Sequence, residues 1–192
     1  MKYTAVADVG NAIVEMLQEV LVPDLILNPE HIALCSPGEK GDTVLGIYLY
    51  DVSTDEGIQI TDMLHINARK QKYPPTCLSL SYMITAYSAG DMKFKYSEEQ
   101  RILGKVIQVL KDSAVLDSET LKPTLQSTGI NIRMQMQSLS LEEKYRIWNA
   151  PNSPYKLSLF YKASPILIES LRSKVAQRVV ETEFSVNEEE SY

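Results

Sequence analysis

The chain has few of the residues on which catalytic and metal sites depend. Its 192 residues include only two histidines, two cysteines and one tryptophan. His31 and His65 have no further histidine, cysteine or acid at a ligand spacing such as HExxH or CxxC, so we interpret both as structural. The eight glycines form neither a phosphate-binding loop nor the turn that exposes a nucleophilic serine. We therefore expect no enzyme activity, no metal and no cofactor.

Three further features of the sequence limit the cell compartment and the binding partners that we expect. Cys35 and Cys77 lie in apolar, strand-like runs, which is typical of buried reduced thiols. No apolar run approaches membrane-spanning length, and Asp8 interrupts the segment where a signal peptide would be apolar. The formal net charge of −6 argues against a general electrostatic grip on nucleic acid. We predict a cytoplasmic protein that binds no membrane, no nucleic acid and no small-molecule substrate.

What is present indicates one ordinary globular domain. Hydrophobic residues make up 44% and charged residues 23% of a chain long enough for one core and too short for two. We expect a single domain over residues 1–186. The acidic residues 187–192 read as a disordered tail.

The most informative segment is a long strand predicted for Thr76–Ser88, directly after two prolines. Side chains alternate along a strand, so one face is apolar and predicts a core, with Leu78, Leu80, Tyr82 and Ile84. The opposite face is small and mildly polar, with Cys77, Ser79, Ser81, Met83 and Thr85. That second face suits the close approach of a helix or another subunit.

The remaining patterns predict an α+β domain with a mixed, mostly antiparallel sheet packed by two main helices. Helices are expected at residues 4–22, capped by Thr4 and ended by Pro23, at 97–111, capped by Ser97, and from Ser140 to Trp148, with short helical possibilities around 117–121. Strands are expected at 31–35, 43–52, 58–67, 130–137 and 155–162, and the strand at 43–52 reads as central because both of its faces are largely covered. Residues 165–180 fit either one helix or two β arms at 166–171 and 175–184.

Four segments in this order resemble the cap, or tail-terminator, family of phage-tail-like contractile injection systems. They are the N-terminal amphipathic helix, the strand Thr43–Val52, the Pro-Pro strand, and the run from Leu139 through Trp148 to Pro165. The resemblance covers residues 4–185 and depends on the order and spacing of the segments. It implies a phage tail-terminator-like fold.

The resemblance also implies a structural role. The chain would form a hexameric ring at the baseplate-distal end of the particle, end the inner tube and anchor the last sheath ring. Its partners would be further copies of itself together with the tube and sheath proteins. It would be cytoplasmic during assembly and then part of a particle that can be released from the cell.

Two alternatives stay open on the sequence. One is a neck or tail-completion protein of a related phage-like particle, which a ring lumen lined by lysine and arginine would favour. The other is a small enzyme or ligand-binding domain, for which a deep pocket with convergent polar groups would be diagnostic.

Candidate interface residues come from the basic run at 68–72, from Tyr73 as an aromatic interface candidate, and from strand-like segments in the second half of the chain. The basic run reads first as a solvated loop and alternatively as a contact to an acidic patch on a partner. The C-terminal arms read as edges for strand addition, with the strand at 130–137 second. The predicted interface residues are Arg69, Lys70, Lys72, Tyr73, Arg133, Ile166, Ile168, Arg172, Lys174, Val175 and Val179.

Overall fold

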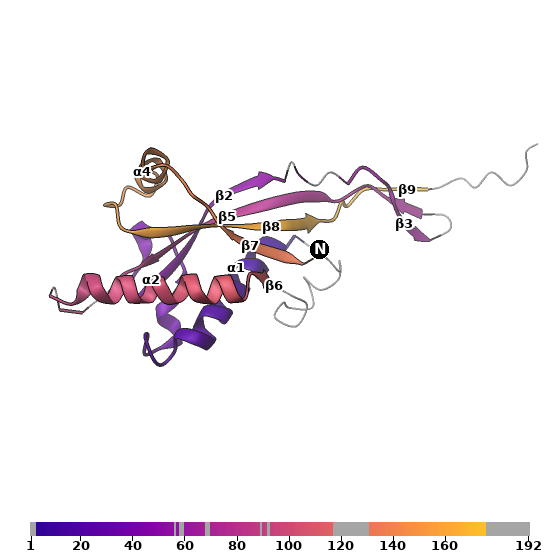
Figure 1. Cartoon of the computed structure of the whole chain (residues 1–192). Helices are drawn as coiled ribbons and strands as arrows, with labels where there is room; N and C mark the ends of the chain where they lie inside the picture. Colours follow the sequence, from indigo (N-terminus) through magenta and orange to yellow (C-terminus); the bar gives the residue numbers. More distant parts are fainter. Residues whose placement is uncertain are drawn as a thin grey trace, which may run out of the picture.

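The structure is a computed structural model that describes residues 3–55, 57, 60–67, 70–88, 90–91, 93–116 and 131–175. Its centre is a six-stranded sheet in the order β1-β2-β5-β8-β7-β6, in which only the β1–β2 pair is parallel (Figure 1). The strands are β1 (Ile32–Leu34), β2 (Leu45–Thr54), β5 (Thr76–Ala86), β6 (Val115–Leu116), β7 (Ile132–Met136) and β8 (Ser158–Ile168). The predicted mixed, mostly antiparallel α+β fold is confirmed.

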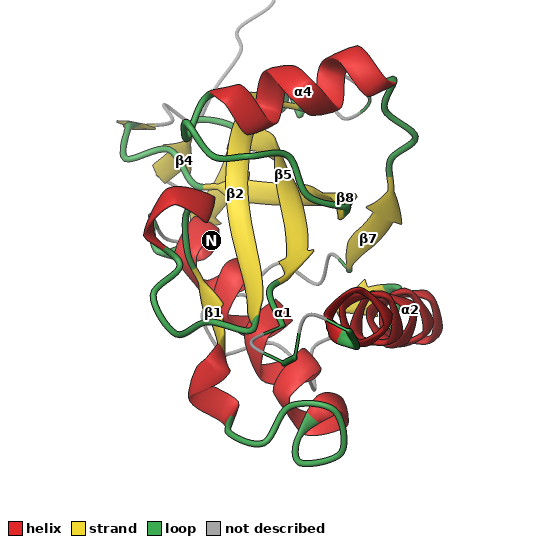
Figure 2. Ribbon diagram, turned by 90° about the vertical axis from the view of Figure 1, so that its left-hand side faces the viewer, coloured by secondary structure: helices red, strands yellow, loops and turns green. Residues whose placement is uncertain are grey.

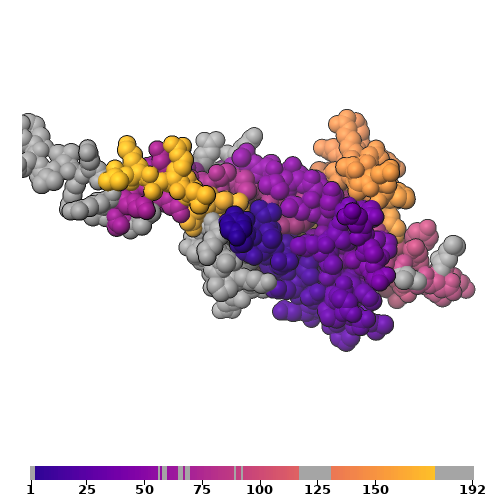
Figure 3. All heavy atoms as spheres, turned by 180° about the vertical axis from the view of Figure 1, so that it is seen from behind, coloured from indigo at the N-terminus to yellow at the C-terminus, as the bar shows by residue number. Residues whose placement is uncertain are grey.

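A second, three-stranded sheet extends the first beyond one end of the body. It consists of β3 (Leu64–Asn67), β4 (Lys70–Lys72) and β9 (Ser173–Val175), in the order β3-β4-β9. Along the chain β2 leads to β3, β4 leads to β5, and β8 leads to β9, so this order repeats the β2-β5-β8 order of the main sheet. We call these three short strands the arm, which projects past the rest of the molecule in Figures 1 and 3.

Two long helices cover one face of the main sheet and form the larger core. They are α1 (Ala5–Leu21) and α2 (Lys95–Asp112). Their buried residues recur at helical spacing and pack on the face of β5 that carries Leu80, Tyr82 and Ile84. The apolar alternation of the Pro-Pro strand therefore predicted the core face correctly.

The third described helix, α4 (Leu141–Asn149), covers the opposite face of the sheet (Figure 2). Ser140 begins it with a capping box, because its hydroxyl accepts a bond from the Glu143 amide while the Glu143 carboxylate accepts one from the Ser140 amide. Trp148 is 1% exposed and packs with Met83, Tyr87 and Phe160. The small second face of β5 thus receives a helix of the same chain. Short 3₁₀ turns, η1 (Pro29–His31) and η2 (Pro37–Glu39), flank β1.

Several predicted boundaries and roles are wrong. Helix α2 begins two residues before Ser97, with Phe94 at the N-cap position, and Thr4 makes no side-chain cap to α1. Strand β8 does not end before Pro165 but continues to Ile168. The β5–β8 register shifts between Leu78 and Leu80, opposite this segment, and such a bulge accommodates a residue without an N–H donor.

For residues 165–180 the sequence pattern fits either a helix or two β arms. Their described part, up to Val175, contains the end of β8 and all of β9, and it contains no helix. The rest of the second predicted arm, the short helical possibilities at 117–121 and the acidic tail at 187–192 lie outside the described residues. Both cysteines are free, as predicted; Cys77 is buried and Cys35 half-buried, and burial raises the pKa of each thiol.

Candidate interaction surface

The arm brings together predicted interface residues that lie about a hundred positions apart in the chain. Lys70 is the register partner of Val175, and Lys72 is the register partner of Ser173, so Lys174 lies between them opposite Gln71. Tyr73 follows directly, and its amide donates to the carbonyl of Arg172 at 3.1 Å. Six of the eleven predicted residues therefore form one surface: Lys70, Lys72, Tyr73, Arg172, Lys174 and Val175.

Two side-chain contacts fix the base of the arm. The ammonium of Lys72 lies 2.5 Å from a carboxylate oxygen of Glu169, and this hydrogen bond holds the pKa of the carboxyl below its usual range. The guanidinium of Arg172 stacks over the ring of Tyr73, with its central carbon 4.4 Å from the ring centroid. These contacts join the β4 and β9 sides of the arm to the end of the main sheet.

The arm exposes apolar side chains beside its positive charges. Val175 is 73% exposed and Leu64 is 42% exposed, and Leu171, immediately before β9, is fully exposed at 101%. Single exposed apolar residues are common, but here three occur on a narrow projection with Lys70, Arg172 and Lys174. This combination is typical of a surface that contacts another protein.

The other predicted interface residues do not share this location. Ile166 is 0% exposed and belongs to the larger core, and Ile168 is half-buried as the partner of Thr76 in the β5–β8 ladder. Neither isoleucine belongs to a separate edge, because β8 continues through both. Arg133 is on β7 in the main sheet, where it is the register partner of Ser164 on β8. Arg69 and Val179 lie outside the described residues.

Two main-sheet strands are covered on their outer sides only at the start. β6 pairs with the first two residues of β7, Ile132 and Arg133, and no strand among the described residues pairs with the outer side of its end, so β7 has partial edge character. β2 was predicted to be central, yet β1 pairs only with its first three residues, Leu45–Ile47. The sequence correctly indicated that both faces of the first half of β2 are covered. The burial of a strand's faces, however, does not show whether another strand pairs with its edge.

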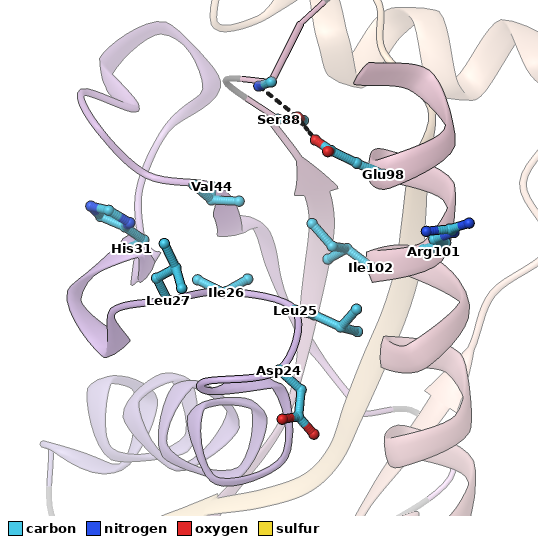
Figure 4. A pocket seen from close by; sticks show the side chains of 11 residues that line it. Asp24, Leu25, Ile26, Leu27, His31, Val44, Ser88, Glu98, Arg101 and Ile102 are labelled. Atoms are coloured by element: carbon cyan, nitrogen blue, oxygen red, sulfur yellow. Dashed lines mark hydrogen bonds between the residues drawn. The ribbon is translucent and has the colours of Figure 1, made fainter. Parts of the chain in front are cut away.

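A cavity of about 420 Å³ lies between α2, the segment after α1 and the ends of β2 and β5 (Figure 4). Its polar side chains do not converge on one point. Glu98 points to Ser88, whose hydroxyl donates a hydrogen bond to the Glu98 carboxylate at 2.5 Å (Figure 4). Arg101 and Asp24 point away from this pair. The arrangement does not provide the convergent polar groups that the ligand-binding alternative requires.

A neighbouring hollow of about 380 Å³ carries basic groups that the sequence did not indicate. The ammonium groups of Lys40 and Lys156 lie 5.3 and 5.4 Å from the ring centroid of Tyr87. Lys156 also contacts Glu99 at 2.5 Å, and burial raises the pKa of Tyr87 to about 12. Lys156, just before β8, therefore contacts both Glu99 on α2 and Tyr87 at the end of β5. These contacts connect the three elements.

Neither a metal centre nor a membrane segment emerges from the described parts of the chain. Among those residues, no cluster of three or more histidine, cysteine, aspartate or glutamate side chains could hold a metal ion. In the same residues, no helix is both long and apolar enough to cross a bilayer.

The fold and its surface define a protein that presents sheet edges and a basic arm. The chain belongs to the family described as the Pvc16 N-terminal domain, whose model matches residues 8–182. No curated protein sequence matches the chain.

Two solved structures share the fold. One is described as the sheath/tube terminator, in the extended state, of PVC, an extracellular contractile injection system; it is 17% identical with a TM-score of 0.66, over 97% of this chain and 65% of its own. The other is the tube-terminating cap of the anti-feeding prophage, 17% identical with a TM-score of 0.59, over 94% of this chain and 61% of its own. The chain therefore spans less than two thirds of either protein.

Proposed function

We propose that this chain is the terminator, or cap, of a contractile injection system. In this role it forms a hexameric ring at the baseplate-distal end of the particle, stops growth of the inner tube and anchors the last sheath ring. Support comes from the family and from the two structural relatives, which are described as terminators of such particles. Termination needs shape and contacts and no catalysis.

The arm is the single observation that links the proposed role to particular residues. A projecting, basic, three-stranded sheet with exposed valine and leucine residues can add strands from a neighbour through its backbone groups. We take residues 1–186 as a single domain whose body positions this arm. The protein assembles in the cytoplasm and leaves the cell with the particle.

The direct test is the length of the particles. Deleting the gene should give tubes or sheaths of widely varying length, because nothing stops subunit addition, and a plasmid copy of the full chain should restore one length. Electron micrographs of the purified particles measure this distribution. Particles of normal length in the deletion strain would refute the proposal.

A further inference from the structure

The outer edge of β2 is open over most of its length. The last bond between it and the β1 segment joins the Cys35 amide to the Ile47 carbonyl at 3.1 Å. Beyond this bond, no strand among the described residues pairs with that side of Tyr48–Thr54. Val52 is 47% exposed, and the strand is solvent-exposed from Asp51 onwards. A long strand with free backbone groups is a template for strand addition.

A groove of about 490 Å³ lies where β1 leaves β2. Its walls are mainly apolar and come from the first half of α1, the end of β1 and the open edge of β2. Gly10 lets the helix approach closely, because a Cβ there would lie 3.0 Å from the side chain of Leu34. Beneath them the hydroxyl of Tyr82 is buried with no hydrogen-bond partner in the described part of the chain. The open edge thus has an apolar pocket at its start.

A second open edge lies on the opposite side of the molecule. β9 is the last strand of the arm, and its outer side is unpaired within the described ranges. Because β3-β4-β9 repeats the order β2-β5-β8, the outer edge of β9 and the open edge of β2 lie at opposite ends of the strand order that the two sheets share. One copy cannot join its own two edges, but the β9 edge of one copy can meet the β2 edge of the next.

Charge and side-chain character match across these two edges. The β9 segment carries Lys174, with Arg172 just before it, and the exposed half of β2 carries Asp51. Asp55 follows β2 directly, where its carboxylate also accepts hydrogen bonds from Gly57 and Ser79. Val175 is 73% exposed on one edge, and Val52 is the exposed apolar residue on the other. Opposite charges within a Debye length of about 8 Å fix the orientation in which two edges meet.

We propose that the occupant of the β2 edge is the β9 segment of a second copy of this chain, which adds as a strand along Tyr48–Thr54. The contact is head-to-tail, and such a contact closes a ring when the rotation between successive copies divides a full turn, as the proposed hexamer requires. This inference rests on the ring in the proposed function, and it assigns the two surfaces that make it.

The test uses disulfide cross-linking in the full chain, both in purified particles and with the isolated protein at high concentration. Val52→Cys combined with Lys174→Cys, or with Val175→Cys, should give covalent dimers and higher ladders on a non-reducing gel after oxidation. The matched control is Val52→Cys with Lys93→Cys, because Lys93 lies two residues before α2, and α2 begins at the end of the body away from the arm (Figure 1). This control pair and the single variants should stay monomeric on the gel.

A charge exchange provides a second readout that is less sensitive to the exact strand register than a disulfide, because charges act over several ångströms. Asp51→Lys and Lys174→Glu should each weaken self-association about three- to tenfold, and the double variant should restore it. Lys93→Glu should leave it unchanged. Absence of both cross-links together with no recovery in the double variant would overturn the inference. Normal ring formation and particle length in that case would leave the cap role standing, whereas unaltered length after gene deletion would refute the cap role alone.

Discussion

Replacing Trp148 by alanine should destabilise the protein by about 3–5 kcal/mol, the usual cost of removing a large aromatic ring from a core. Trp148 is 1% exposed and is the largest fully buried side chain in the described residues. It anchors α4, which has nine residues and is too short to be stable in isolation. Losing the ring therefore removes its packing against Met83, Tyr87 and Phe160, and with it the attachment of α4 to the sheet.

The assay is urea unfolding followed by far-ultraviolet circular dichroism, which needs no tryptophan signal. The free energy of unfolding is obtained from the midpoint and slope of each curve. The control is Tyr145→Ala on the same helix, where the ring is 45% exposed and should cost clearly less. A loss below about 1 kcal/mol for Trp148→Ala would refute the claim that this residue holds α4 on the sheet.

Trp148→Phe should lower the free energy of unfolding by much less than the loss of buried ring area suggests. The indole N–H is buried and has no hydrogen-bond partner among the described residues. Phenylalanine removes this unpaired donor, whose burial costs about 1–3 kcal/mol, and this gain offsets part of the lost packing. A phenylalanine variant as unstable as the alanine variant would contradict this reasoning.

Three further predictions concern other parts of the fold. Gly46→Ala should destabilise by about 1–3 kcal/mol, measured by thermal unfolding, because the new Cβ would lie 2.8 Å from the sulfur of Cys35; an unchanged melting temperature would contradict this. Ser140→Ala should cost about 1 kcal/mol by removing the hydroxyl cap of α4, whereas Ser140→Asp should retain most of the stability. The Lys72 contact lowers the folded-state pKa of Glu169, so its contribution is present above the usual carboxyl pKa of about 4.3 and is lost as pH falls through the lowered value. Hydrogen exchange of the β4 and β9 amides, corrected for intrinsic rate, should therefore rise as the pH is lowered below the usual carboxyl range, and equal acid sensitivity in Glu169→Gln would refute this cause.

Much of the fold could be predicted from local patterns. The alternation of Leu80, Tyr82 and Ile84 identified the core face of β5, and the helical spacing before Pro23 identified α1. Ser140 was predicted correctly as a cap because Glu143 follows at the capping-box spacing. In each case the deciding interactions lie within a few residues of one another.

The errors arose where distant residues decide the structure. Pro165 looked like a strand end, but a bulge in the pairing with β5 accommodates it. Ile166 looked like part of an exposed arm, although the core covers it completely. The arm residues were chosen for their charge and pattern, which say nothing of the pairing of Lys70 with Val175, because that pairing depends on the long β5–β8 ladder that brings both segments together. The open edge of β2 was missed because strand order is not encoded in the alternation of one strand.

The most direct test of the cap role is the position of the protein on the particle. A gold-labelled tag on the full chain, viewed by electron microscopy, should mark only the end opposite the baseplate, with one cluster of labels on each particle. Labels distributed along the sheath, found at the baseplate or absent from purified particles would contradict the account.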